Sequence, residues 1–412
     1  MNSENSRQTM RARGEALNLS TFFCLYMAQM VPMSFLSTAL QVMMRENHFS
    51  LSAIALLQLV KLPWILKFLW APLVDRHCVT IHQYKRFIFS SECVYATALL
   101  VVGMLDFTTD IYIVVALVIL SLTASATQDI ATDSLAVLAF HRQDKSMVNS
   151  IQSMGSFGGT LVGGGLLLMV LHHYGWNVVL TCLAAFVLLM LIPLMTNRQI
   201  SIESKDMKQR ARLSDFFWFF TRKSIWRQIA FLVLYYAGLI GILSVLRPYL
   251  VDLGYSMKEI GVLSGVVGTG FAFAASFGAG FLVRRIGLYK ARILFALLTL
   301  FTTVYFVGIT YIRPTFPLVC TAVVLLWSSY GVSTMVVFTS SMNSVRPGRE
   351  GTDFTVQTVI THLSGMFLAL SAGRIADIFQ YRGLFVVESA VAVISLVYAI
   401  FSFRKGEVDY SK

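Results

Sequence analysis

Ionisable side chains occur inside stretches that are otherwise strongly apolar, and these residues have the most chemistry to offer. They are Lys61, Lys67, Glu92, Asp129, Asp133, Arg247 and Glu388. A charged side chain in the middle of a hydrocarbon layer costs at least ~2.5–3.5 kcal/mol, so we expect each to face a partner or a water-filled cavity. Asp129 and Asp133 share one face of a helix, where two ionised carboxylates repel each other. A shared proton or a nearby cation would relieve that repulsion.

The composition indicates that these residues lie in a membrane protein. The chain has 412 residues, of which 56% are hydrophobic and 13% are charged, and its mean hydropathy is +0.70. Soluble domains carry about 25% charged residues, so the composition excludes a soluble enzyme, a nucleic-acid reader and a disordered regulator. The net charge of +12 is better explained by basic loops at the inner membrane surface than by a nucleic-acid partner.

With about 20 apolar residues required for each membrane span, the sequence predicts twelve membrane-spanning helices. The spans are expected at residues 17–43, 51–74, 87–106, 111–136, 148–171 and 177–196, and then at residues 229–250, 258–283, 293–312, 317–342, 355–373 and 384–403. This pattern predicts a six-helix bundle at residues 1–197, a cytoplasmic linker at residues 198–228 and a second six-helix bundle at residues 229–412. Aromatic residues among the charges of the linker favour an amphipathic helix on the membrane surface.

Basic residues fix the predicted orientation. With both termini in the cytoplasm, most of the 33 lysines and arginines fall in inner loops, as the positive-inside rule requires. The outer loops are too short to fold as domains. Any chemistry is therefore expected within or between the spans.

Similar short segments recur in the two groups of spans and indicate a duplication. Residues 49–57 open the second span, and residues 255–263 open the eighth with a similar pattern. At the inner ends of the same two spans, residues 73–76 correspond to residues 282–285. The sequence therefore predicts two related halves of six spans each.

The end of the second span resembles a motif of the major facilitator superfamily. Asp75 and Arg76 match the Asp-Arg pair that precedes the third helix in that superfamily, while Ala71 and Cys78 stand where glycine is usual. The resemblance implies two six-helix bundles that open a central cavity alternately to either side. It also implies an inner gate built from Lys67, Asp75, Arg76, Asp129 and Asp133.

A narrower resemblance rests on residues 62–76, residues 128–133 and the Gly-Thr-Asp-Phe-Thr segment at 351–355. Together they are similar to the branch that contains AmpG-type muropeptide permeases, acetyl-CoA transporters and the siderophore permeases that import rhizobactin or pyochelin. The compact length and residues 351–355 are closer to the siderophore permeases. Muropeptides remain the alternative substrate.

Two interpretations of the span-four carboxylates stay open. In one, Asp129 or Asp133 takes up and releases a proton and so couples transport to the proton gradient. In the other, Lys67, Asp75 and the two aspartates form a structural ion-pair network that holds the inner gate shut. Nothing in the spacing of these residues decides between the two.

Two basic residues are candidate contacts for an anionic substrate group. Arg247, near the outer end of span seven, has a guanidinium group that binds carboxylate through two hydrogen bonds, and the alternative is that it reaches the outer headgroups. Lys61 falls near the bilayer centre, and its alternative is an ion pair with Glu92 or an aspartate.

Polar and aromatic side chains on spans one, seven and ten are further candidates for substrate contact. They are Gln29, Tyr235, Trp327 and Tyr330. In the superfamily that the chain resembles, these spans line the central cavity. The alternative is bundle packing, because Tyr and Trp fill cores whenever their polar atom finds a partner.

Glycines recur every fourth residue in two spans. They are Gly155, Gly159 and Gly163 in span five and Gly261 and Gly265 in span eight. Such stripes permit close contact between helices. They suit either the sliding surfaces of alternating access or static packing.

Enzyme motifs are absent from the sequence: it contains no His-Glu-x-x-His, no Gly-x-Ser-x-Gly and no Walker lysine loop. We expect an all-α inner-membrane secondary transporter of bacterial type that is not an enzyme, needs no metal or cofactor and is a monomer. Its expected partners are the lipid bilayer, protons and a small organic solute such as a siderophore, and no nucleic acid. A non-transporting receptor or an intramembrane enzyme is the alternative of another class.

Overall fold

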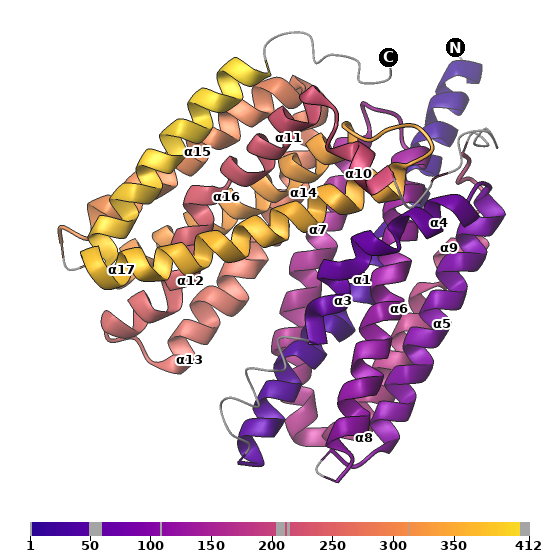
Figure 1. The fold of residues 1–412 in the computed structure, drawn as a ribbon, viewed down its shortest axis with the longest axis horizontal. Coiled ribbons are helices and arrows are strands. Elements are labelled where there is room, and N and C mark those ends of the chain that lie inside the picture. Colours follow the sequence, from indigo (N-terminus) through magenta and orange to yellow (C-terminus); the bar gives the residue numbers. More distant parts are fainter. Residues whose placement is uncertain are drawn as a thin grey trace. The chain divides into compact units, whose positions relative to one another are not determined.

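The fold is all-helical over the part of the chain that the computed structural model describes, which comprises residues 2–48, 60–107, 109–202, 211, 215–312 and 314–403. In those residues only helices, turns and loops occur (Figure 1). The prediction of an all-α membrane protein is therefore confirmed. The start of the predicted second span and most of the polar linker lie outside the described residues.

The chain divides into two compact units. The first unit comprises residues 1–141, 158–215 and 347–355, and the second comprises residues 142–157, 216–346 and 356–412. Helices α7 (Lys145–Leu161) and α17 (Glu350–Ser402) therefore contribute residues to both units. The predicted division into two sequence halves at residues 198–228 stays a prediction.

Nine helices of the described residues are long and apolar enough to cross a membrane. Two of them, Lys145–Thr196 and Glu350–Ser402, are each longer than 50 residues and are interrupted by a non-helical residue, Gly175 or Gln380. Each is thus a pair of spans, since about 20 residues suffice to cross a bilayer. The predicted second span is described only from residue 60 onward, so the count of twelve stays a prediction.

The first unit begins with α1 (Asn2–Glu46), and three short helical pieces follow. These are α3 (Leu62–Leu66), η2 (Lys67–Leu69) and α4 (Ala71–His77). Pro63 and Pro72 each lie in the first turn of their helix, where the missing N–H is not needed. The succession of short pieces turns Lys67 and Asp75 inward, where both are 2% exposed.

Three longer helices complete the framework around those short pieces. Helix α5 (Ile81–Met104) starts with a capping box in which Thr80 and Gln83 bond each other's backbone. It packs along α6 (Ile111–Ala139) and α8 (Leu167–Met190), as Figure 1 shows. The apolar core between them includes Leu99, Val118 and Leu180. The last turn before the linker is α9 (Ile192–Thr196).

The second unit includes residues 216–219 of the short helix α10 (Asp215–Phe219). It contains α11 (Lys223–Leu234), α12 (Ala237–Asp252), α13 (Met257–Ile260), the π-helix η5 (Gly261–Gly268), α14 (Thr269–Ile286), α15 (Leu288–Ile309) and α16 (Phe316–Met342). Helix α16 packs against α14 and α15. Exposed aromatic side chains at Phe217, Trp218 and Trp226 agree with a linker that touches the membrane surface.

A buried arginine joins four helices of the second unit. Arg292 of α15 is 1% exposed and donates from Nη2 to the hydroxyl of Ser340 over 2.8 Å. Its guanidinium carbon lies 5.1 Å from the ring centre of Phe231 and 4.1 Å from that of Phe403. The cation therefore gains both a hydrogen bond and cation–π contacts, which keep α11, α15, α16 and the end of α17 together.

Glycines of span five pack against α1 within the first unit. A Cβ atom at Gly163 would lie 2.2 Å from the Val31 carbonyl oxygen, and one at Gly159 would lie 2.5 Å from the Met30 Cβ atom. Added Cβ atoms at Gly261 and Gly265 meet no atom within 4 Å among the described residues. The Gly159 and Gly163 contacts therefore support static packing.

We expect Gly163→Ala to destabilise the protein by about 1–3 kcal/mol, because the methyl group has no room against the α1 backbone. Gly165 is the matched control. It lies in the same π-helix, η3 (Val162–Leu166), and a Cβ atom there meets nothing within 4 Å, so Gly165→Ala should stay within about 0.5 kcal/mol. Thermal unfolding in detergent measures both, and equal midpoints for the two variants would contradict the packing.

Candidate functional site

The first unit contains an ion pair that is buried in the protein. Lys67 of η2 contacts Asp129 Oδ2 of α6 through its Nζ atom, and the two side chains are 2% and 4% exposed. Lys67 Nζ also lies 4.8 Å from the centre of the Trp64 ring. Removal of either partner of such a pair leaves an uncompensated charge inside the protein. The structure thus brings together two of the ionisable residues that the sequence singles out.

Helix α1 presents two polar side chains to the same stretch of α6. Gln29 Nε2 donates to Asp129 Oδ1 over 2.7 Å, and the Tyr26 hydroxyl donates to Asp133 Oδ1 over 2.9 Å. Tyr26 and Gln29 are about one helical turn apart, as are the two aspartates, so the pairs meet where α1 and α6 run side by side. Gln29, expected to touch substrate, here orients the Asp129 carboxylate.

Asp75 of α4 caps the N-terminus of α17. Its Oδ2 atom accepts hydrogen bonds from the Thr352 amide at 2.7 Å and from the Thr352 hydroxyl at 2.8 Å. Its Oδ1 atom accepts one from the Gly351 amide at 3.1 Å. The first amides of a helix have no partner inside it, and a negative charge there is stabilised by the helix dipole. We call this arrangement the Asp75 cap.

A chain of hydroxyl groups joins the Asp75 cap to span four. Ser134 of α6 donates to Asp75 Oδ1 over 3.1 Å and lies 2.7 Å from the Tyr84 hydroxyl of α5. Because the serine proton points to Asp75, Tyr84 is the donor to Ser134. Ser134 follows Asp133 directly in the sequence. A movement of α6 at its aspartates would therefore also move Ser134, which donates a hydrogen bond to Asp75 in the cap.

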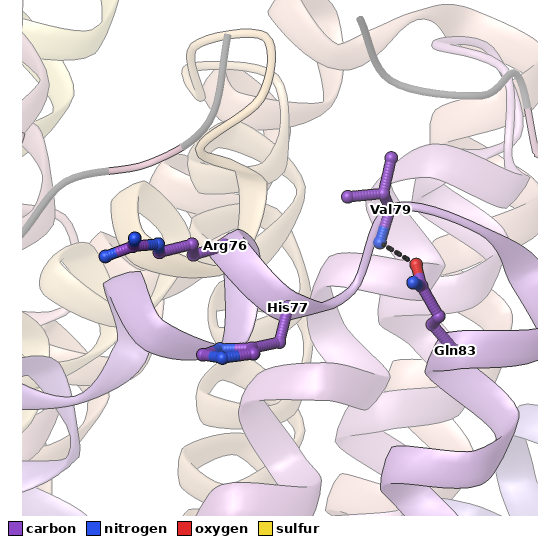
Figure 2. A pocket seen from close by; sticks show the side chains of 4 residues that line it. All are labelled: Arg76, His77, Val79 and Gln83. Atoms are coloured by element: carbon purple, nitrogen blue, oxygen red, sulfur yellow. Dashed lines mark hydrogen bonds between the residues drawn. The ribbon is translucent and has the colours of Figure 1, made fainter. Parts of the chain in front are cut away.

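Arg76 lies beside the cap but is exposed. Together with His77, Val79 and Gln83 it lines a hollow of about 480 Å³. Figure 2 shows these four side chains at the end of α4 and in the residues that follow. The Val79 amide donates to Gln83 Oε1 over 2.9 Å, and His77 Nδ1 donates to the Leu73 carbonyl over 2.7 Å. The first of these hydrogen bonds fixes the loop after α4, and the Arg76 side chain extends away from Val79 and Gln83 (Figure 2). The gate role expected for Arg76 stays a prediction.

The two predicted anion contacts are less buried than the ion pair. Lys61 is half-buried and lines a small cavity with Ser37 and Gln41. Arg247 is exposed. Glu92, an alternative partner of Lys61, is 0% exposed, and neither of its carboxylate oxygens has a hydrogen-bond partner among the described residues. The alternative ion pair between Lys61 and Glu92 is therefore not observed there.

Aromatic candidates of the second unit form a cluster. The Tyr330 ring centre lies 6.1 Å from that of Tyr236, 6.2 Å from that of Trp327 and 5.7 Å from that of Phe157. Trp327 Nε1 has no hydrogen-bond partner in the described part of the chain. Tyr235 is 1% exposed and donates to the Arg292 carbonyl over 2.9 Å. Tyr235 thus has a packing role, whereas Trp327 keeps a donor available.

Most of the chain matches the sequence model of one protein family. The sequence model of the Major Facilitator Superfamily matches residues 20–369. The chain belongs to this superfamily. It is therefore a multi-pass membrane protein of the transporter type, as the Asp-Arg motif at Asp75 and Arg76 predicts.

Relatives within the superfamily include permeases. The anhydromuropeptide permease of Escherichia coli K12 is 26% identical over 277 residues, which is 65% of this chain and 56% of the permease. The match therefore spans little more than half of the permease. A Rickettsia felis protein that bears the transporter name AmpG 4 is 20% identical over 412 residues, 95% of this chain and 97% of the relative. The prediction of a superfamily member resembling the AmpG-type branch is confirmed.

Solved structures of the superfamily share the fold. The human organic anion transporter TETRAN has a TM-score of 0.72 at 13% identity and covers 93% of this chain and 99% of its own. The E. coli fucose:proton symporter FucP has a TM-score of 0.68 at 13% identity and covers 95% and 98%. At these identities the likeness shows the fold alone.

Several site residues of this superfamily member were not predicted from the sequence. Tyr26, Tyr84 and Ser134 are ordinary core residues by their pattern, so no local signal distinguishes them. Gly351 and Thr352 do carry one, because they open a helix whose first amides need an acceptor. A buried aspartate such as Asp75 is the acceptor that this signal calls for.

Proposed function

We propose that the protein is a secondary transporter of a bacterial cytoplasmic membrane that imports a medium-sized organic solute together with protons by alternating access. Superfamily membership supports the transporter class. The observation that carries the coupling proposal is the buried ion pair between Lys67 and Asp129. A buried pair between two helices is a two-state element, since its stability depends on the charge of the carboxylate.

Protonation of Asp129 would cancel the attraction that holds Lys67. The Lys67 ammonium group would then need another acceptor, and Asp133 lies one helical turn from Asp129 on the same helix face. Uptake of a proton by this pair of carboxyl groups thus changes which contact joins η2 to α6. In this proposal Lys67, Asp129 and Asp133 carry the coupling proton and its counter-charge.

The Asp75 cap is the proposed inner gate. It ties α4 to the first residues of α17 through three hydrogen bonds, and Ser134 connects it to α6. A change at Asp129 and Asp133 therefore reaches the cap along one helix. Arg76, next to Asp75, is proposed to help close the same gate.

The anhydromuropeptide class is the substrate that the comparisons support. Proteins with similar sequences include a permease named for it. Such solutes carry carboxylates, which guanidinium and ammonium groups bind. We propose Lys61 and Arg247 as contacts for those carboxylates, and Trp327 and Tyr330 as contacts for the apolar and hydroxyl parts of the solute.

A ferric siderophore is the second candidate substrate. The observation in its favour is the Gly-Thr-Asp-Phe-Thr segment at residues 351–355, which resembles the corresponding segment of siderophore permeases. Siderophores are also medium-sized, and many are anionic, so the same basic side chains would serve. Competition between the two solutes for uptake distinguishes the candidates.

The test uses purified protein in proteoliposomes with labelled anhydromuropeptide and labelled ferric siderophore. We expect wild-type protein to accumulate one of them about tenfold for each coupled proton and each unit of imposed pH gradient, since one unit corresponds to 1.36 kcal/mol per proton. Asp129→Asn and Asp133→Asn should keep gradient-independent exchange and lose this accumulation. Asp110→Asn, at the start of α6, is the control that should behave as wild type.

Three results would count against the proposal. If both variants still accumulate solute in response to the pH gradient, these carboxylates have no coupling role. Loss of folded protein in both variants, judged by size-exclusion chromatography, assigns them to structure alone. Release of a chemically altered solute would instead indicate an enzyme.

A further inference from the structure

One face of α17 follows α12 closely in the second unit. A Cβ atom at Gly238 would lie 2.7 Å from the Glu388 carbonyl oxygen and 3.5 Å from the Ala392 Cβ atom. Two turns after Glu388, Ser395 donates to the Tyr235 carbonyl over 3.2 Å. Glu388, Ala392 and Ser395 are spaced to share one helix face. That face therefore runs along the first turns of α12 and the residues just before it.

The helix of span seven is broken where this face meets it. Helix α11 ends at Leu234 and α12 begins at Ala237, and the Leu239 amide bonds the Tyr236 carbonyl instead of the Tyr235 carbonyl that a continuous α-helix would use. The carbonyl of Tyr235 accepts from Ser395 instead. Discontinuous helices in transporters mark ion and substrate sites, because their freed backbone groups and loose geometry allow movement.

A carboxyl group fills a notch immediately beyond the break. A Cβ atom at Gly241 would lie 1.7 Å from Glu388 Oε1 and 2.4 Å from its Cδ atom. With the Glu388 carboxyl group in this position, only glycine fits at residue 241. The notch formed by Gly238 and Gly241 therefore seats the side chain of Glu388 against the α12 backbone.

Among the described residues, no counter-charge lies against Glu388 in the notch. Glu388 is 6% exposed and makes no hydrogen bond or ion pair with the residues that the structure describes. The ionisable groups of α12 lie elsewhere. The rings of Tyr249 and Phe385 meet edge to face with their centres 5.4 Å apart, Asp252 accepts a hydrogen bond from Tyr381 over 2.6 Å, and Arg247 is exposed. Helix α15 presents Phe306 to the same turn, 5.3 Å from Phe385. A carboxylate buried without a partner is strongly disfavoured relative to its neutral form.

We propose that Glu388 is a proton-binding carboxyl group of the second unit. In its neutral form it occupies the Gly238–Gly241 notch and holds α12 straight beyond the break. When the proton leaves, the charged side chain has to leave the notch as well, and α12 is then free to bend at Tyr235 and Tyr236. In the predicted topology Glu388 lies about 6 Å from the outer end of span twelve, at 1.5 Å per residue, so the proton would enter from outside.

The inference rests on the proposed proton-coupled function and adds a second proton site to it. The two sites are separable by experiment, because Glu388 is not part of the Lys67–Asp129 ion pair. Binding of a proton at Glu388 is also measurable without any solute. A hydrophobic carbodiimide, dicyclohexylcarbodiimide, reacts with protonated carboxyl groups in apolar sites and reports them by the mass of the labelled peptide.

The first arm of the experiment labels wild-type protein in proteoliposomes over a pH series. We expect the peptide that contains Glu388 to gain the carbodiimide adduct at low pH and to lose it progressively as pH rises. Glu388→Gln should remove the adduct from that peptide. If the carbodiimide labels other carboxyl groups of the protein but forms no adduct on Glu388 at any pH, the inference is overturned.

The second arm compares transport by Glu388→Gln and Glu388→Asp. Glu388→Gln should retain solute exchange and lose about tenfold in accumulation at one unit of pH gradient, the factor that one proton supplies, whereas Glu388→Asp keeps a carboxyl group and should retain part of the accumulation. Full accumulation by Glu388→Gln overturns the inference and leaves the proposed function intact. If wild-type protein shows no driven accumulation, the proposed function fails, and the labelling arm alone decides whether Glu388 binds a proton.

Discussion

Replacement of Lys67 by methionine is expected to lower the free energy of unfolding by about 3–5 kcal/mol, the usual loss when one partner of a buried ion pair is removed. Methionine keeps the volume of the side chain, so the loss reports the charge and not a cavity. Asp129 is left as a buried charge, with Gln29 as its remaining donor at 2.7 Å. Thermal and chemical unfolding of the protein in detergent measure the effect.

Lys61→Met is the matched control. Lys61 lies in the same predicted span and makes no ion pair within the described part of the chain, so its substitution should change stability by less than about 1 kcal/mol. The double variant Lys67→Met/Asp129→Asn should recover most of the stability, because it leaves no unpaired charge. A double variant as unstable as the sum of its single variants would show that the two side chains do not interact.

Asp75→Asn is expected to reduce transport about tenfold or more, because hydrogen bonds to a charged group contribute about 1.5–3 kcal/mol and 1.4 kcal/mol is a factor of ten in an equilibrium. The variant removes the negative charge that holds the Gly351 and Thr352 amides, and it places amide protons against them. The inner gate should therefore close incompletely. Hydrogen exchange at the first residues of α17 should rise together with the loss of transport.

Thr352→Val provides a graded comparison for the cap. It removes only the hydroxyl donor to Asp75 Oδ2 and leaves both backbone amides bonded. Its loss of transport and its rise in amide exchange should both be smaller than those of Asp75→Asn. Unchanged exchange at Gly351 and Thr352 in Asp75→Asn would refute the cap as a gate element.

Much of the fold could be predicted from the sequence, because a membrane span has to be long and apolar. The spans predicted at residues 87–106 and 111–136 correspond to α5 (Ile81–Met104) and α6 (Ile111–Ala139). The prediction did not foresee that residues 62–77 form three short helical pieces. Pro63 and Pro72 are the local signal for that division, since proline starts a new helix more readily than it continues one.

Only the charged residues of the candidate site could be predicted from the sequence. Lys67, Asp129 and Asp133 stand out because charged residues in apolar spans need partners, and the structure brings Lys67 and Asp129 together. Tyr26 and Tyr84 do not stand out, because a tyrosine in a span has the same pattern whether it packs or donates a hydrogen bond. Their partners depend on which helices become neighbours, and one sequence does not contain that information.

Two of the predicted substrate contacts form hydrogen bonds within the protein, and their role in substrate binding stays a prediction. Gln29 and Tyr235 were expected at a substrate surface because they lie on spans that line the cavity in the superfamily. In the structure each satisfies a buried group, the Asp129 carboxylate for Gln29 and the Arg292 carbonyl for Tyr235. Buried polar groups need hydrogen-bond partners. A side chain that serves as such a partner has fewer hydrogen-bonding atoms left for a solute.

The most direct test of a proton-coupled importer is the movement of protons that solute alone produces. Proteoliposomes with a trapped pH dye, equal pH on both sides and no membrane potential are given external anhydromuropeptide, or ferric siderophore in a parallel sample. The account predicts that the interior acidifies as solute enters, and that Asp129→Asn lets solute enter without acidification. Entry of solute into wild-type proteoliposomes with no change of internal pH would contradict it.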